Sequence, residues 1–210
     1  ASRNAENGVS MVQTAEGGLN EVSNILTRMR ELTIQASSDT VGDKERGFLN
    51  KEYQQLNQEI DRIADSTTFN GTQLLNGEGS EELEFHVGAE AGEVHRIKFD
   101  SSEANTRTDA IGVEGTTISN KEDARGAIDQ IDGAIDKVSG HRASLGSIQS
   151  RLESTISNLN VQAVNQENAR SVIEDVDVAK ETSKLASNNV TKQAGVATLA
   201  QAQKLPNQAL

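Results

Sequence analysis

The feature that most constrains this fold is a run of apolar residues at alternating steps of three and four in the second half of the chain. The run continues without proline for about forty residues, well beyond an ordinary globular helix. This spacing predicts one long helix, about residues 120–170, that packs through a coiled-coil-like seam. The residues of this predicted packing and assembly seam are Ile128, Ile131, Ile135, Val138, Leu145, Leu152, Ile156 and Leu159.

The ends of the predicted long helix are indicated by two capping patterns. Ser119 stands three residues before Glu122, and Ser171 stands three residues before Glu174. A serine followed at this spacing by glutamate is the pattern of a capping box, which begins a helix. The second box therefore predicts a separate closing helix, over residues 176–210.

Two further helices are predicted in the first part of the chain. Apolar residues recur at steps of three and four through about residues 4–37, and again through about residues 44–65. The residues between these two segments contain turn formers and no apolar rhythm, which indicates a short loop. A short loop between two helices predicts an antiparallel pair.

Between the second and third helices the pattern changes to the alternation that is typical of strands. Leu83 and Phe85 alternate with polar residues, a glycine-rich turn follows, and Ile97 and Phe99 alternate in the same way. This predicts a β-hairpin over about residues 81–100 with one apolar face, which packs on the helices because an isolated hairpin is marginally stable. Residues 101–117 are polar and rich in turn formers, and we predict a loop there.

The predicted fold is therefore mainly α: an elongated antiparallel helical bundle with a long coiled-coil-like rod and a small β-hairpin packed on it. Residues 1–175 form the core domain of this prediction. Its interior must be aliphatic, because 34% of the residues are hydrophobic and only 2% are aromatic. Narrow seams between helices suit such a composition.

The closing helix has an apolar stripe and no predicted partner within the chain. Its last part, "QAGVATLAQAQKLPNQAL", carries one charge, at Lys204. A helix of this composition needs another surface to cover its apolar side chains. The residues that we expect to contact such a partner are Leu185, Val190, Val196 and Leu199.

No set of residues has the spacing of a catalytic or metal site. His86, His95 and His141 lack the spacing of metal ligands, and "GHRASLGS" brings histidine and serine together only within a helical repeat. We therefore expect no enzyme activity, no metal and no cofactor. The net charge of −12 opposes nucleic-acid binding, and no apolar run approaches the ~20 residues of a membrane span, so we expect neither partner.

A small surface cluster is the remaining candidate for binding. Arg28 and Leu32 lie four residues apart and share a face of the first helix, and an antiparallel second helix brings Glu52 alongside. An arginine, an exposed aliphatic side chain and a glutamate form a plausible binding site. The alternative is that Leu32 packs inward and that Arg28 and Glu52 are ordinary surface charges.

Several stretches of the sequence, in order, closely resemble bacterial flagellin. These are "ASRNAENGVSMVQTAEGGLNEV", "LTRMRELTIQAS", "EIDRIADSTTFNGTQLL" and the closing segment that begins at "ENARSVIEDVDVAKETSKLASNN". The resemblance covers about residues 1–77 and 120–210, with a looser match over the hairpin. It indicates a flagellin core with its C-terminal helix, and the chain is expected to be a fragment or processed form that lacks the N-terminal assembly segment.

This resemblance implies a secreted, extracellular subunit that polymerises with itself into the flagellar filament for swimming motility. In flagellins the C-terminal helix serves filament assembly, and an export chaperone binds the same helix. Two alternatives stay open: a hook-associated junction protein, and a coiled-coil binding module that forms no filament.

The resemblance also implies a host partner. In flagellins that the vertebrate Toll-like flagellin receptor recognises, the receptor contacts an arginine and a leucine of an "RxREL" motif and a glutamate on the next helix. The matching residues are Arg28, Leu32 and Glu52.

Overall fold

The computed structural model describes residues 1–78, 82–88, 92–102, 104–174 and 177–204 of the 210-residue chain. The chain forms two compact units, unit 1, Ala1–Asn160, and unit 2, Val161–Leu210. The sequence placed a domain boundary near residue 175, whereas the boundary between the units falls inside a long helix. The buried positions of that helix end at Leu152, and its side chains beyond residue 160 are exposed.

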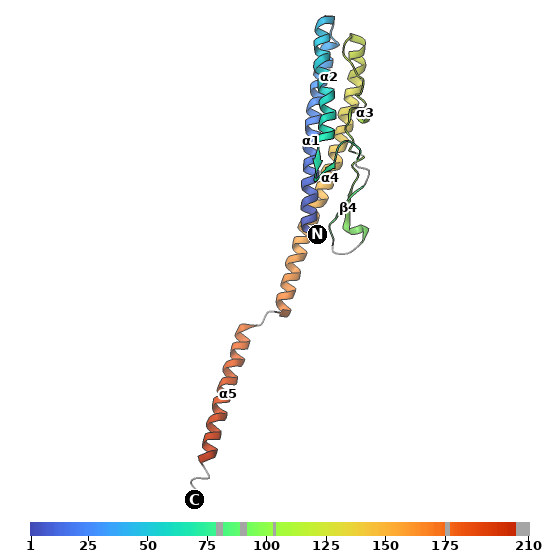
Figure 1. Cartoon of the computed structure of the whole chain (residues 1–210). Helices are drawn as coiled ribbons and strands as arrows, with labels where there is room; N and C mark the ends of the chain where they lie inside the picture. The colour runs from blue at the N-terminus through green and yellow to red at the C-terminus, as the bar shows by residue number, and fades with distance from the viewer. Residues whose placement is uncertain (79–81, 89–91, 103, 175–176, 205–210) are drawn as a thin grey trace. The chain divides into compact units, whose positions relative to one another are not determined.

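Unit 1 is a bundle of long helices. α1, Ser2–Ala36, and α2, Asp43–Ser66, run antiparallel, and the first part of α4, Lys121–Glu174, lies alongside them (Figure 1). Apolar residues of α1 at steps of three and four, from Val12 to Met29, are almost completely buried between these helices. The structure confirms the predicted mainly α fold with a small packed hairpin.

Unit 1 also contains two small antiparallel sheets. The predicted hairpin is formed by β3, Leu83–His86, and β4, Arg96–Phe99, with a short 3-10 helix, Glu93–His95, before β4. Its inner residues include Ile97 and Phe99, which are buried. The second sheet pairs β1, Thr68–Phe69, with β2, Thr72–Gln73. Although Asn-Gly marks its turn, strands of two residues are too short for an alternating pattern, and we did not predict them.

The described part of the segment after the hairpin is mostly irregular, as the predicted loop requires, but it is also partly buried, which the sequence did not indicate. It contains a short helix, α3, Thr108–Ile111, and we call residues 106–118 the connector. Its side chains alternate between the interior and solvent, which leaves these six buried: Thr106, Thr108, Ile111, Val113, Thr116 and Ile118.

Polar side chains along one face of α2 hold the connector. Asn57 donates to the carbonyl oxygen of Val113 at 3.1 Å, and Gln54 donates to that of Thr116 at 2.8 Å. Asp61 accepts hydrogen bonds from the backbone N–H and the hydroxyl of Thr108, at 2.9 and 3.0 Å. Backbone groups of an irregular segment need such partners when they are buried. The sequence shows these residues as an ordinary polar helix face, which is why the packing of the connector was missed.

Tyr53 joins α2 to the connector in the interior of unit 1. Its side chain is fully buried, and its hydroxyl lies 2.6 Å from the Thr116 hydroxyl. Thr116 donates its one hydroxyl proton to the carbonyl oxygen of Val113, so Tyr53 is the donor toward Thr116. Burial raises the pKa of Tyr53 above its ordinary value of 10.0.

We expect alkaline pH to destabilise unit 1 through Tyr53. Above pH 10 the unfolded chain releases the tyrosine proton while the folded chain retains it, so the free energy of unfolding falls as pH rises above that value. Tyr53 is the only tyrosine and the chain has no tryptophan, so ultraviolet absorbance reports its ionisation directly. Tyr53→Phe should lose less stability over this pH range. A phenolate signal from a chain that retains native circular dichroism would contradict this expectation.

Neither capping serine caps the helix that was predicted from it. Asn120, and not Ser119, caps α4, because its side-chain oxygen accepts the backbone N–H of Asp123 at 2.8 Å. Ser171 lies inside α4, which continues to Glu174. In unit 2 the following helix, α5, Val178–Lys204, is capped instead by Asp177, which accepts the backbone N–H of Lys180 at 3.1 Å.

Glycines in the helices of unit 1 have contrasting surroundings. A Cβ atom added at Gly133 of α4 would meet no atom within 4 Å, whereas one added at Gly18 of α1 would lie 2.7 Å from Leu75 Cδ1 and 2.8 Å from Thr67 Oγ1. Gly133→Ala should therefore raise the free energy of unfolding by about 0.5–1 kcal/mol through helix propensity. Gly18→Ala should lower it, and urea midpoints of the two variants measure the contrast.

Candidate interaction surfaces

The predicted seam of α4 is buried at half of its positions. In unit 1 these predicted residues are buried: Ile131, Val138, Leu145 and Leu152. These predicted residues are only half-buried: Ile128, Ile135, Ile156 and Leu159. The buried set is spaced by seven residues, which is one position of the heptad, so the other position of the repeat differs from the prediction.

That other position lies one residue earlier than predicted. Ala127 and Ala134 are buried in place of Ile128 and Ile135, and Ile148 is buried as well. The two alanines lie in the interior of unit 1, and the larger isoleucines beside them are half-buried at the edge of the seam. The repeat of small residues at seven-residue spacing was the sequence signal for this register, and the isoleucine pattern concealed it.

Arg28 and Glu52 are brought together as predicted from an antiparallel pair. The Arg28 Nε donates to Glu52 Oε1 at 3.0 Å, and a second guanidinium nitrogen donates to Glu31 at 3.0 Å. Hydrogen bonds to Glu52 and then to Glu31 raise the pKa of Arg28. All three side chains are about half exposed, so they form an accessible charged cluster that bridges α1 and α2.

Leu32 does not belong to the exposed part of this cluster. Its exposed fraction is 1%, so the expectation of an exposed aliphatic contact at this position is wrong. Four residues of α-helix rotate a side chain by about 40°, which is enough to direct Leu32 into the α1–α2 interface while Arg28 stays at the surface. Leu32 packs inward, as the alternative interpretation held.

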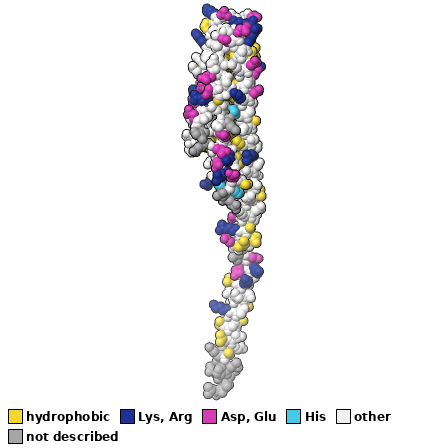
Figure 2. Space-filling model, turned by 90° about the vertical axis from the view of Figure 1, so that its right-hand side faces the viewer, with side chains coloured by type: hydrophobic (Ala, Val, Ile, Leu, Met, Phe, Trp, Pro, Cys, Tyr) yellow, Lys and Arg dark blue, Asp and Glu magenta, His cyan; other side chains and the backbone are white. Residues whose placement is uncertain are grey.

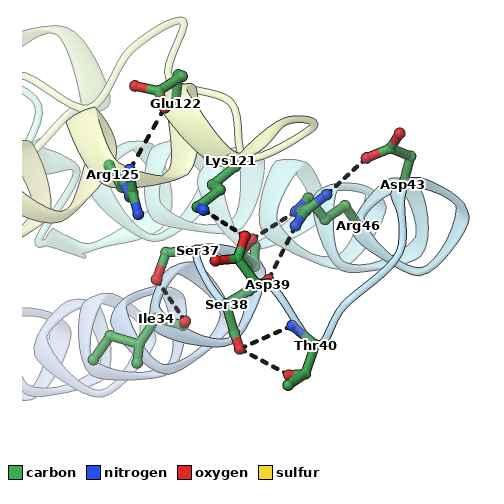
Figure 3. A network of polar contacts seen from close by, with 11 residues as sticks. Ile34, Ser37, Ser38, Asp39, Thr40, Asp43, Arg46, Lys121, Glu122 and Arg125 are labelled. Carbon is green, nitrogen blue, oxygen red and sulfur yellow. Dashed lines mark hydrogen bonds and ion pairs between the residues drawn. The ribbon is translucent and has the colours of Figure 1, made fainter.

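A polar network closes the end of unit 1 where α1 turns into α2 (Figure 3). Arg46 is buried and donates to the carbonyl oxygens of Ala36 and Ser38, at 2.7 and 3.0 Å, and to Asp43 at 2.7 Å. The Ala36 carbonyl belongs to the last turn of α1, so Arg46 caps this helix from the next one, and the Ser38 carbonyl also accepts the backbone N–H of Val41 at 3.4 Å. The turn is also tied to the start of α4.

That tie is an ion pair between Asp39 of the turn and Lys121 of α4 (Figure 3). The hydrogen bond from Lys121 lowers the pKa of Asp39. The aspartate is largely exposed, so the contact positions the turn and adds little to stability.

A groove of about 690 Å³ lies between the region of β4 and α4 in unit 1. His141, Ser144 and Ser147 are among its lining residues. The Ser147 hydroxyl donates its proton in a hydrogen bond of 2.8 Å to the backbone oxygen of Ser144. A serine nucleophile needs a base within hydrogen-bond reach of its hydroxyl, and this arrangement instead directs the hydroxyl to the backbone.

In unit 2, α5 exposes the apolar side chains that the sequence predicted to need a partner. Figure 2 shows hydrophobic side chains at the surface of this helix. Each of the four predicted contact residues is between 62% and 66% exposed: Leu185, Val190, Val196 and Leu199. An isolated helix with this much exposed apolar surface gains stability from association.

The described residues also bear on membrane and metal binding. Among them, no helix combines the length and the apolar composition that crossing a bilayer requires. Within the same residues, no three histidine, aspartate or glutamate side chains lie close enough together to hold a metal ion.

Comparison with known proteins identifies relatives over the whole chain. The model of the bacterial flagellin N-terminal helical region matches residues 1–80, and that of the C-terminal helical region matches residues 128–210. Flagellin of Halalkalibacterium halodurans is 42% identical over 210 residues, which cover all of this chain and 76% of the relative. The flagellar filament 31.3 kDa core protein of Treponema maltophilum is 37% identical over 217 residues, covering 96% of this chain and 74% of the relative.

Solved structures agree with the sequence comparison. The crystal structure of Bacillus cereus flagellin superimposes with a TM-score of 0.68 at 31% identity, covering 80% of this chain and 95% of that one. A putative flagellar hook-associated protein from Vibrio parahaemolyticus has a TM-score of 0.59 at 16% identity, covering 83% and 88%, and shows a likeness of fold alone. The two family models match both ends of the chain, a flagellin is 42% identical over the whole length of the chain, and a solved flagellin shares its fold. This chain therefore belongs to the bacterial flagellin family.

Proposed function

We propose that this chain is a structural subunit of the bacterial flagellar filament, secreted and working outside the cell. The observation that carries the proposal is the exposed apolar stripe of α5 in a member of the flagellin family. Head-to-tail contacts between identical subunits generate an open helical polymer when the rotation from one subunit to the next does not close a ring. Ordering and burial of such a stripe between subunits would drive assembly, and no chemical step is needed.

Motility tests this proposal. The full gene product that contains this sequence, expressed in the source bacterium after deletion of its flagellin genes, should restore filaments and swimming. The same gene with a frameshift before α5 is the control and should restore neither. Restored export without filaments would favour the coiled-coil binding module, and short caps or junctions without filaments would favour the hook-associated alternative.

The same stripe supports an export chaperone as a partner. Leu185, Val196 and Leu199 lie within about 60° of one another around α5, whereas Val190 lies on another face. A chaperone that covers the first three would keep α5 from associating before export. In this proposal the chaperone binds through an apolar groove that accepts a helix. Calorimetry with the chaperone of the source bacterium should detect binding to the chain and a loss of at least about tenfold in affinity after Leu199→Ser.

The charged cluster of Arg28, Glu31 and Glu52 supports a further partner, the Toll-like flagellin receptor of hosts. Arginine is enriched among the residues that contribute most to binding at protein interfaces. Here the Arg28 guanidinium is fixed in position by hydrogen bonds to the carboxylates of Glu52 and Glu31. Leu32 enters this proposal only through packing that positions the helix turn beneath Arg28, because it is buried.

We expect Arg28→Ala and Glu52→Ala each to weaken receptor binding by at least about tenfold, as loss of an interface hot spot does. Surface plasmon resonance with the receptor ectodomain measures the affinity, and circular dichroism checks the helices. Arg62→Ala is the matched control, because Arg62 also forms an exposed ion pair on α2, with Glu59. If both variants keep intact helices and bind the receptor with unchanged affinity, the cluster is not a receptor-binding site.

A further inference from the structure

The sequence contains the dipeptide Asn-Gly in three places, and the structure gives each one a different environment. Asn7-Gly8 lies inside α1, Asn70-Gly71 forms the turn between β1 and β2, and Asn76-Gly77 follows β2. This dipeptide can rearrange chemically without an enzyme, since glycine offers little steric hindrance to attack by its backbone nitrogen. The rearrangement requires the asparagine side chain to reach that nitrogen.

We propose that Asn70 is a site of spontaneous deamidation and that the fold protects the other two asparagines. The Gly71 backbone nitrogen loses its proton to a base in the solvent and attacks the Asn70 Cγ. A new C–N bond closes a five-membered succinimide, and the side-chain nitrogen takes up a proton from the solvent as its bond to Cγ breaks and leaves as ammonia. Water then opens the ring at one of its two carbonyl carbons, which gives either aspartate or isoaspartate, with no oxidation or reduction.

Three observations favour reaction at Asn70. The side chain is exposed, and no hydrogen bond to it is present among the described residues. Asn70 has a positive φ of 50°, and Gly71 follows with a φ of 81° and no atom within 4 Å of a Cβ position. The flanking strands have two residues each, so few hydrogen bonds resist the opening that the attack requires.

The other two pairs lack these conditions. In α1 the Gly8 nitrogen takes part in the helical hydrogen-bond ladder, and a Cβ at Gly8 would lie 3.0 Å from Phe85 and 3.2 Å from Leu152. Asn76 is only 3% exposed, and its side-chain oxygen accepts the backbone N–H of Glu78 at 3.0 Å. Opening either site costs the packing around it, which restrains the reaction.

Reaction at Asn70 would change the turn in two ways. Either product adds a negative charge, and isoaspartate also inserts a methylene group into the backbone of a two-residue turn. The pairing of Phe69 with Thr72 depends on that turn length, so the β1–β2 register would be lost in the isoaspartate form. This inference is independent of the proposed filament function, because it concerns the chemistry of the folded chain.

Peptide mass spectrometry tests the inference. The folded chain is kept at mildly alkaline pH for a series of times and then cleaved by trypsin, which yields residues 4–28 with Asn7 and residues 63–96 with Asn70 and Asn76. Fragmentation assigns the deamidated position within each peptide. Asn70 should deamidate at least about tenfold faster than either Asn7 or Asn76.

The unfolded chain provides the control. In concentrated urea the three sites should react within about threefold of one another, since each is followed by glycine and no fold protects it. Asn70→Gln, which would have to close a larger ring, should remove the early product from residues 63–96 of the folded chain. The inference would be overturned if Asn70 of the folded chain deamidates less than about tenfold faster than Asn7 or Asn76, or if the same difference in rate persists in urea. Both rates are measured on the unsubstituted chain, so the test stands even if the variant fails to fold.

Discussion

Replacing Leu152 by alanine should lower the free energy of unfolding of unit 1 by about 2–5 kcal/mol. Leu152 is fully buried, and its side chain lies against α1, where a Cβ at Gly8 would come within 3.2 Å of it. The cost combines the lost burial of the side chain with the cavity that remains. Urea unfolding followed by circular dichroism measures the change.

Val164→Ala is the matched control for this substitution. Val164 lies on the same helix, α4, but in unit 2, where its exposed fraction is 59%. Its truncation should change the free energy of unfolding by no more than about 0.5 kcal/mol. Equal effects of the two substitutions would mean that Leu152 is not buried in the seam.

The second large effect is expected in assembly. Changing Leu185, Val196 and Leu199 of α5 to serine should abolish elongation of filaments by the full gene product. Each of these side chains would contribute about 1.5–3 kcal/mol if it were fully buried between subunits. Pelleting after addition of sheared filament seeds measures elongation, and the thermal unfolding of unit 1 should be unchanged.

A set of polar substitutions on the same helix controls for general damage to α5. Asn188→Ser, Gln193→Ser and Gln201→Ser together alter as many residues and leave the apolar stripe intact. This variant should elongate seeds as the unsubstituted protein does. Elongation by the variant without the apolar side chains would show that α5 is not the assembly surface.

The sequence predicted those parts of the fold that rest on repeated apolar spacing. The long helices α1 and α2, the part of α4 in unit 1 and the β3–β4 hairpin bury one regular face each, and regular burial leaves a periodic pattern. In the seam of α4 the apolar spacing allowed two registers that differ by one residue. Isoleucine dominates a hydrophobicity pattern, whereas the residues that are buried in unit 1 are the alanines at positions 127 and 134.

The connector and the surface cluster show why the remainder could not be predicted. The connector is held by Asn57, Asp61 and neighbouring polar side chains that bond to backbone groups far away in sequence, and polar residues on a helix carry no signal for such partners. For the surface cluster, spacing correctly paired Arg28 with Glu52. Spacing alone could not decide the orientation of Leu32, which depends on a rotation of a few tens of degrees.

The most direct test of the central claim is electron microscopy of the full gene product after seeding with sheared filaments. Filaments should lengthen from the seeds with time, and they should stop lengthening when α5 carries the three serine substitutions. Discrete oligomers of fixed size, with or without those substitutions, would contradict the claim that this flagellin-family chain is a filament subunit.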